Sequence, residues 1–394
     1  MPLVIPEREL SFRMALRLIV PVLYLCLIFD VFAGFFLGAH FSKFVENYPY
    51  LLIVLPGLMG LRGNVFGAMA SRLSTAFYLG SSEADFRDRY VITNSFFSVW
   101  LATMPVLILL LIALAKYPDV SSILTATQIA VSSSVISAGV VSACTTEVVI
   151  VAFRKSIDPD SISGPLITSI ADLITIPSII FLIVLFEVQV SWILALLMFF
   201  VLVISVIFSV REKRNWSIYK ESLAIVCSLA LIQSITGNLL EEFSEIVYLS
   251  FFVGFAYPSI IDQFGNYGSI VVARTSTKLH LGEIEGFDLK KAIKDIKYIL
   301  LTTPLVFPFI SIVPLVLAYL YFGFVYVNAV LFAIFFFSFI IVVFLLLLLS
   351  FWIAVLLHMV KIDPDNGGIP LITTIADVIG TIYAVAIAWL FITF

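Results

Sequence analysis

The segments DPDSISGPLITSIAD (158–172) and DPDNGGIPLITTIAD (363–377) are two copies of one pattern within a chain of 394 residues. Ten of the fifteen aligned positions are identical, and the alignment needs no gap. Upstream of them, residues 56–83 align with residues 258–285. Because both pairs of segments recur at nearly the same spacing, the sequence predicts an internal duplication that covers most of the chain.

The composition indicates a membrane protein. Hydrophobic residues make up 62% of the chain and charged residues only 12%, whereas a soluble domain averages about 45–50% apolar and about 25% charged residues. Such an excess of apolar side chains needs a lipid bilayer as its solvent. The formal net charge of −4 is small and gives no indication of nucleic-acid binding. The three cysteines are widely spaced in apolar segments and predict neither a disulfide framework nor a zinc site.

Apolar runs predict about eleven membrane-spanning helices, and therefore an all-α polytopic membrane protein. The expected spans cover roughly residues 16–39, 49–79, 91–115, 123–153, 163–186, 191–210, 222–240, 246–279, 298–322, 325–358 and 369–393. With the N-terminus in the cytoplasm, seventeen basic residues fall inside and only Lys43 and Lys116 fall outside. This asymmetry predicts a cytoplasmic N-terminus and a C-terminus on the opposite side, in a multi-pass protein of the cell membrane.

The duplicated segments divide these spans into two repeats of five helices. We expect the first repeat to cover residues 1–190 and the second to cover residues 216–394, with an additional transmembrane helix in the linker 191–215. A repeat with an odd number of spans would be inverted in its copy, but the additional helix restores the orientation. The two repeats should then be parallel and related by a pseudo-two-fold axis along the membrane normal. Such a pseudo-dimer within one chain does not require a homo-oligomer.

Asp172 and Asp377 are the strongest candidates for ion-binding residues. Each ends one copy of the duplicated segment and lies about ten residues into the last span of its repeat, which is ~15 Å along a helix and near the bilayer midplane. Thr168 and Thr373 lie one turn earlier, so the polar side chains form a stripe on an apolar helix. Carboxylates that hydrogen-bond between helices are the simpler interpretation. We favour an ion pathway, because ionisable residues within a membrane are usually functional.

Two facing carboxylates predict a divalent cation as the bound ion. Carboxylate oxygens are hard ligands that suit Mg²⁺, which releases its water molecules reluctantly and is held by few protein ligands. Ca²⁺ and Mn²⁺ fit the same chemistry and stay as alternatives. The ion is expected to be cargo, and no organic cofactor is predicted.

Matched polar and small residues accompany these acids in the second span of each repeat. Asn64 corresponds to Asn266, and Gly63 corresponds to Gly265. The asparagines lie at membrane depth and are candidates for pore-lining residues or for hydrogen bonds between helices. The glycines indicate either close helix packing or a helix break that directs carbonyl groups toward a pore.

Four further charged residues within predicted spans have no charged counterpart in the other repeat: Asp30, Arg62, Glu147 and Asp262. An ion pair between Arg62 and Asp262 across the pseudo-axis would give both a structural role. Glu147 lies beside two threonines and is a candidate either for coupling to protons or Na⁺ or for a structural role.

Four acids mark the predicted cytoplasmic starts of the last spans: Asp158, Asp160, Asp363 and Asp365. Asp-Pro followed by a polar residue is a common helix start, which alone would explain the motif. Four acids at one mouth of a pathway would also concentrate cations there.

These motifs resemble those of the MgtE-type magnesium transporter family. PGLMGLRGNVFGAMASRLSTAFYLG (56–80) is similar to the signature of that family, and most similar to the first half of its two-repeat relatives in solute carrier family 41. PSIIDQFGNYGSIVVARTSTKLHLG (258–282) resembles the matching second-half motif, and the two segments quoted first resemble the DP…GP…TT…D stretch. The resemblance covers both repeats and therefore nearly the whole chain.

The resemblance implies transport of Mg²⁺, with Asp172 and Asp377 binding the ion in the pore and Asp158 and Asp363 forming a further cation site near the cytoplasm. Bacterial members of the family are channel-like, and animal members are described as Na⁺-coupled exchangers. Only about fifteen residues precede the first span, so we expect no large cytoplasmic sensor domain. The second repeat has Gly-Ile-Pro where the family has Gly-Pro.

An intramembrane aspartyl protease is the alternative from a different functional class. That chemistry also needs two close carboxylates, which share one proton. Such proteases carry YD and GxGD motifs, and neither motif surrounds Asp172 or Asp377. The sequence therefore favours a transporter over an enzyme.

Overall fold

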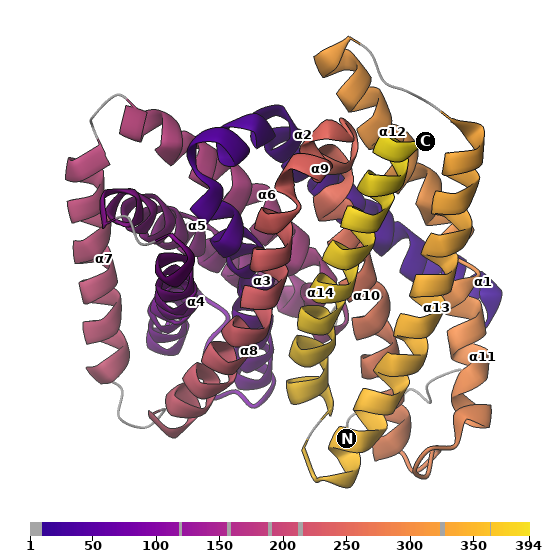
Figure 1. Cartoon of the computed structure of the whole chain (residues 1–394). Coiled ribbons are helices and arrows are strands. Elements are labelled where there is room, and N and C mark those ends of the chain that lie inside the picture. Colours follow the sequence, from indigo (N-terminus) through magenta and orange to yellow (C-terminus); the bar gives the residue numbers. More distant parts are fainter. Residues whose placement is uncertain are drawn as a thin grey trace.

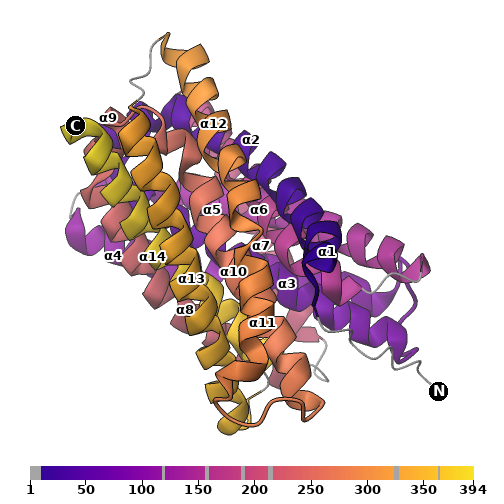
Figure 2. The same ribbon diagram turned by 90° about the vertical axis from the view of Figure 1, so that its right-hand side faces the viewer.

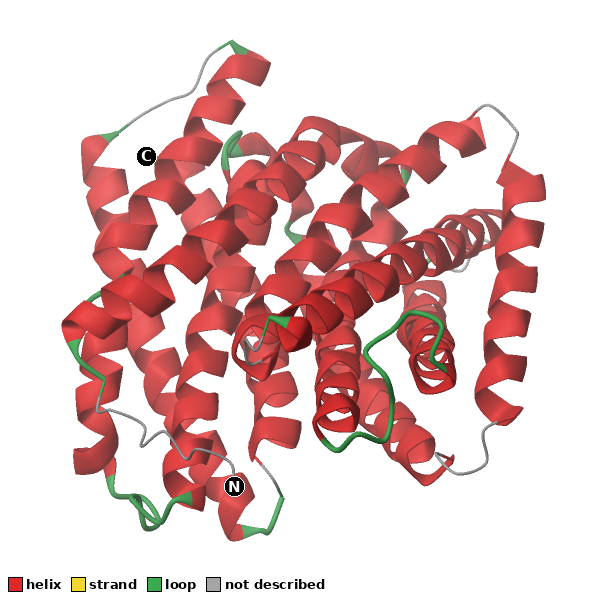
Figure 3. Cartoon of the chain, turned by 180° about the vertical axis from the view of Figure 1, so that it is seen from behind, coloured by secondary structure: helices red, strands yellow, loops and turns green. Residues whose placement is uncertain are grey.

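The structure is a computed structural model that describes residues 10–117, 120–155, 159–187, 191–211, 216–323, 328–362 and 364–394. Within these ranges all regular elements are helical, as the view from behind shows (Figure 3). The elements are α1 (Phe12–Met14), the π-helical turn η1 (Ala15–Ile19), α2 (Val20–Asn47), α3 (Pro49–Tyr78), α4 (Arg89–Lys116), α5 (Val120–Arg154), α6 (Pro159–Glu187), α7 (Ser191–Arg211), α8 (Trp216–Glu242), α9 (Ser244–Leu249), α10 (Val253–His280), α11 (Leu289–Leu300), α12 (Thr303–Phe322), α13 (Ala329–Met359) and α14 (Pro364–Thr393).

Nine helical segments in the described part of the chain are long and apolar enough to cross a membrane. The chain is thus an all-α, multi-pass membrane protein. The other two predicted spans correspond to α7, whose described apolar stretch Ile193–Ser209 is shorter, and to α10. Helix α10 carries many polar side chains and is buried on nearly all sides. Because protein surrounds it, α10 does not need the apolar surface that lipid contact requires. The count of eleven spans stays a prediction.

Two predicted spans are interrupted in the structure. The segment expected at 246–279 is divided into α9 and α10, because Phe251 between them adopts a φ of 58° that no α-helix accommodates. The segment expected at 298–322 starts in the last turn of α11 and continues in α12 after a short turn, and the two helices together form one of the nine candidate spans. A proline in the first turn of α12 favours a new helix start at this position.

The first helix of each predicted repeat packs against the other repeat. Helix α2 contacts α10 and α12, and α8 makes the corresponding contacts with α3 and α4. Figure 1 shows α8 next to α3, and Figure 2 shows α2 passing beside α12. At these crossings a Cβ atom on Gly34 would overlap the carbonyl oxygen of Phe255, and one on Gly237 would overlap that of Ile53. Only glycine allows both pairs of helices to approach this closely.

The other helices divide into a central group and an outer helix. Helices α3, α6, α10 and α14 pack against one another, whereas α7 lies at the outer edge against α4 and α5 (Figure 1). Helix α7 exposes large apolar side chains such as Phe199 and Phe200. Exposed apolar side chains on an outer helix are what contact with lipid requires.

Candidate ion-binding site

Six charged or amide side chains form a buried cluster between the central helices. This central polar cluster consists of Asp30 on α2, Arg62 on α3, Asp172 on α6, Gln233 on α8, Asp262 on α10 and Asp377 on α14. Each of them exposes 7% or less of its surface. Buried charges of this kind persist in a membrane protein only when they are paired, hydrated or bound to an ion.

Asp172 and Asp377 lie near the middle of α6 and α14, at matched positions of the duplicated segment. The two carboxylates are close enough to interact electrostatically. Asp377 accepts a hydrogen bond from the side-chain amide of Gln233. By contrast, Oδ1 of Asp172 is buried and receives no hydrogen bond. A buried carboxylate oxygen without a donor is free to accept a ligand such as a cation or its water.

Arg62 is next to Asp172 rather than Asp262. Its guanidinium interacts electrostatically with Asp172 and donates a hydrogen bond to the hydroxyl of Thr175. No ion pair between Arg62 and Asp262 occurs among these described side chains, so the structural pairing suggested by the sequence is wrong. In the aligned sequences Arg62 corresponds to Phe264, so the second half has no arginine at the matched position.

Asp262 belongs, with Asp30, to a second group of acids within the central polar cluster. Its Oδ2 accepts hydrogen bonds from Ser169 Oγ at 2.6 Å and from Asn266 Nδ2 at 3.4 Å. Asp30 and Asp262 lie close enough to interact electrostatically. Their helices cross one turn away, where Gly34 packs against Pro258. The sequence identified both acids, but it did not identify Ser169, which lies one turn before Asp172 and joins α6 to α10.

Asn64 joins the two halves of the chain. Its Nδ2 donates to Thr374 Oγ1 at 3.3 Å, and its Oδ1 accepts from Thr373 Oγ1 at 3.0 Å. These bonds connect α3 to α14. Asn64 therefore makes hydrogen bonds between helices, one of the two roles expected from the sequence. Asn266 instead bonds within its own helix, to Asp262.

The matched glycines differ in their surroundings. A Cβ atom on Gly63 would lie 2.6 Å from Thr168 Oγ1, so this glycine allows α3 to approach α6. The corresponding distance from Gly265 to Thr373 Cγ2 is an ordinary 3.6 Å. Gly60, one turn before Gly63, makes room for the Asp377 carboxylate and its Gln233 partner.

Two groups of sequence candidates do not join the cluster. Glu147 lies on an exposed face of α5. Asp158 and Asp363 lie outside the described residues, and the side chains of Asp160 and Asp365 are likewise not described.

The matched arginines of the second spans have a structural role. Arg72 Nε donates to Asn94 Oδ1 at 3.0 Å, and Arg274 Nε bonds to Asp295 Oδ2 at the same distance. Lys278 also pairs with Asp295, at 2.8 Å. Both arginines thus hold the second helix of a repeat to the next one.

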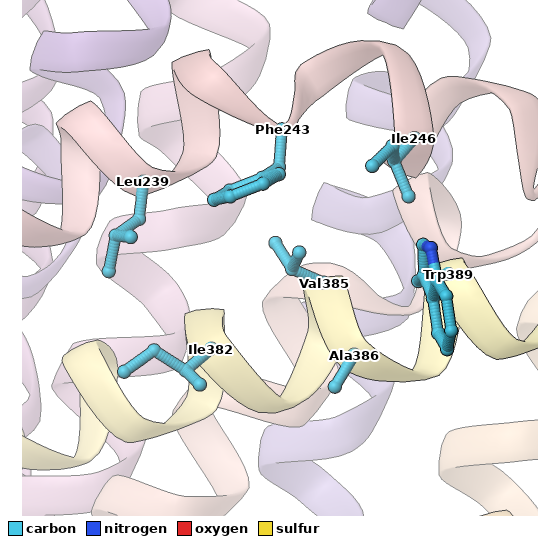
Figure 4. A pocket seen from close by; sticks show the side chains of 7 residues that line it. All are labelled: Leu239, Phe243, Ile246, Ile382, Val385, Ala386 and Trp389. Atoms are coloured by element: carbon cyan, nitrogen blue, oxygen red, sulfur yellow. The ribbon is translucent and has the colours of Figure 1, made fainter.

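A pocket of about 300 Å³ lies between the α8–α9 corner and α14 (Figure 4). Its walls are apolar side chains, among them Phe243, Val385 and Trp389. It offers no carboxylate, so it is not a cation site.

Within the described residues no three acids, histidines or cysteines converge as a complete set of metal ligands. Any ion in the central polar cluster would therefore keep part of its hydration shell, as Mg²⁺ commonly does.

A multi-pass helical protein with matched acids buried at its centre has the architecture of an ion transporter. The chain belongs to the MgtE family of divalent cation transporters, whose family model matches it twice, at residues 55–183 and 257–387. Members of this family are transporters rather than enzymes, which decides against the protease.

Similar proteins belong to solute carrier family 41. Member 2 of Gallus gallus is 27% identical over 296 residues, which are 71% of this chain and 51% of that protein. Member 2 of Xenopus laevis is 33% identical over 178 residues, covering 43% and 31% of the two chains. Member 3 of Mus musculus is 29% identical over 185 residues, covering 43% and 36%. The chain spans about half the length of these relatives or less. No solved structure matches it.

Proposed function

We propose that this protein moves Mg²⁺, or a closely related divalent cation, across the membrane through a pathway between its two repeats. The observation that carries the proposal is the pair Asp172 and Asp377: two matched acids, both buried mid-helix, that interact electrostatically at the centre of the protein. Family membership supports a divalent cation as the substrate.

The chemistry of the two carboxylates favours a hydrated divalent ion. An unpaired carboxylate at the centre of a membrane is costly, and a divalent cation between two of them removes this cost. Mg²⁺ needs only one or two carboxylates and retains its other waters. Neighbouring hydroxyl and amide groups, such as those of Thr168, Thr373 and Asn64, would then contact the waters rather than the ion.

The mouth of the pathway is proposed to lie at the starts of α6 and α14. Asp158, Asp160, Asp363 and Asp365 would attract cations there before they reach the central carboxylates. This assignment rests on the sequence, in which both copies of the duplicated segment begin with Asp-Pro-Asp.

The repeat layout that this pathway requires is 1–190 and 216–394, joined by the linker helix within 191–215. It is supported by the matched contacts of α2 and α8, each of which packs on the second and third long helices of the opposite half. A pathway on a pseudo-two-fold axis would receive one aspartate from each repeat.

The test is flux of divalent cations into liposomes that contain the purified protein. Mg²⁺ uptake should exceed that of empty liposomes and should compete with Mn²⁺ or Ca²⁺ if these ions share the pathway. Repeating the assay with imposed Na⁺ and proton gradients distinguishes a channel from a coupled carrier. Protein-free rates for every divalent cation tested would refute the proposal.

A further inference from the structure

The central polar cluster is asymmetric in charge although the fold places matched residues around it. Asp377 is accompanied by Gln233 and by Gly60, whose missing side chain makes room for the carboxylate. The positions matched to Gln233 and Gly60 in the other half are Asp30 and Asp262. Asp377 thus has neutral residues at the two positions where the other half has acids, although Asp262 interacts electrostatically with both Asp377 and Asp172.

Asp30 and Asp262 face each other without a balancing charge of their own. Their carboxylates interact electrostatically across the crossing of α2 and α10, where Gly34 packs against Pro258. Ser169 Oγ donates to Asp262 at 2.6 Å. Both oxygens of Asp30 are fully buried and receive no hydrogen bond. Neither acid belongs to an ion pair among the described side chains. Two buried carboxylates that are close to each other repel each other strongly unless a cation or a shared proton lies between them.

Arg62 makes the net charge around the Asp172–Asp377 pair less negative than that of the Asp30–Asp262 pair. It interacts with Asp172, so Asp172 and Asp377 together with this guanidinium carry a net charge of −1 when ionised. In the same ionised state, Asp30 and Asp262 together carry −2. By charge alone, a divalent cation is attracted more strongly to the second pair.

We infer that Asp30 and Asp262, together with the hydroxyl of Ser169, form a second divalent-cation position beside the Asp172–Asp377 pair. The inference rests on the proposed transport function and extends it. Two carboxylates and one hydroxyl give three oxygens, and water completes the six-fold coordination of Mg²⁺. The other half of the chain has no equivalent position, because the residues matched to Asp30 and Asp262 are Gln233 on α8 and Gly60 on α3.

The experiment measures Mg²⁺ binding to the full chain in detergent by Mg²⁺-dependent thermal stabilisation, together with Mg²⁺ flux in liposomes. The test variants are Asp30→Gln and Asp262→Asn, and Gln is the residue that the matched helix α8 already accommodates. Each should weaken apparent Mg²⁺ affinity at least about tenfold, because even residues that only contact a metal ligand typically contribute that much. Combining the two substitutions should add little. Glu147→Gln, which removes an exposed acid on α5, is the control and should retain normal affinity.

The outcomes separate this inference from the proposed function. If Asp30→Gln and Asp262→Asn bind and transport Mg²⁺ normally while Asp172→Asn does not, the second position is wrong and the proposed function stands. If the two variants keep their Mg²⁺ affinity but lose a pH dependence that the unmodified protein shows, the pair holds a shared proton and the inference is overturned. If the unmodified protein neither binds nor transports a divalent cation, the proposed function fails first.

Discussion

Arg62 on α3 donates a hydrogen bond to the hydroxyl of Thr175, which lies one turn beyond Asp172 on α6. The bond holds a fully buried guanidinium beside the carboxylate that we propose as an ion ligand. The positive charge lowers the attraction of this position for cations. A transported ion must bind well enough to enter but weakly enough to leave, and Arg62 is placed to provide the second condition.

Arg62→Gln should therefore bind Mg²⁺ more tightly and transport it more slowly. Removing the repulsion of one charge should tighten binding about fivefold, which corresponds to ~1 kcal/mol. Mg²⁺ titrations and maximal flux measure the two effects. Arg72→Gln is the control, since Arg72 lies on the same helix but bonds to Asn94 on α4. Unchanged affinity in a folded Arg62→Gln protein would contradict this role.

Asp172 and Asp377 should behave as one unit. Asp→Asn preserves size and removes one charge, so each single substitution should lower Mg²⁺ flux and Mg²⁺-dependent stabilisation substantially and to a similar extent. The double substitution should then add less than the sum of the two, because the first has already disrupted the shared ion. A double variant with full flux would show that the ion path lies elsewhere.

Gly34 and Gly237 should each be essential for helix packing. Gly34→Ala and Gly237→Ala place a methyl group against a backbone carbonyl of the neighbouring helix, and we expect each to cost about 1–3 kcal/mol of stability. Thermal unfolding in detergent measures the loss. Gly139→Ala, where no atom lies within 4 Å of the added Cβ, should be neutral or slightly stabilising. Equal melting temperatures for all three variants would contradict the close crossings.

Asp88 should stabilise the start of α4 in a pH-dependent manner. Burial alone would raise the pKa of its carboxyl, but hydrogen bonds from Ser82 and from the amides of Glu83, Tyr90 and Val91 hold that pKa below its usual value. Its contribution is therefore present above the pKa of the unfolded chain and is lost as the pH falls through the lower folded value. Asp88→Ala should cost about 1 kcal/mol near neutral pH, and the difference should shrink on acidification. A constant difference in melting temperature from neutral to acid pH would contradict this prediction.

The orientation of the chain can be tested by labelling. In a protein without its native cysteines, a single cysteine within 81–90 or 211–220 should react only from the cytoplasmic side. A cysteine next to Lys116 should react only from the opposite side. If a cysteine within 81–90 and the cysteine next to Lys116 both reacted from the same side, the predicted topology would be refuted.

Much of the fold was predictable because long apolar runs and an internal repeat are local signals. The ends of α3 and α14 lie close to the predicted boundaries, and both matched aspartates fall mid-helix. The break at Phe251 was not predictable, because its neighbourhood is as apolar as a continuous span. Ser169 was missed, and the bond between Arg62 and Thr175 was not predicted, since a hydroxyl on a helix does not reveal which neighbouring helix it will contact. Gln233 was visible only as the residue matched to Asp30.

The contrast between Gly60 and Asp262 has a consequence for how such a protein can change over time. In a dimer of identical chains, one substitution appears twice around the axis, so the number of charges there is always even. Here the two positions are encoded separately, and a single mutation can alter one side of the ion path while the other keeps its original chemistry. The duplicated chain can therefore acquire an odd charge at its centre, as Arg62 illustrates, which no symmetric ancestor of two identical subunits could have carried.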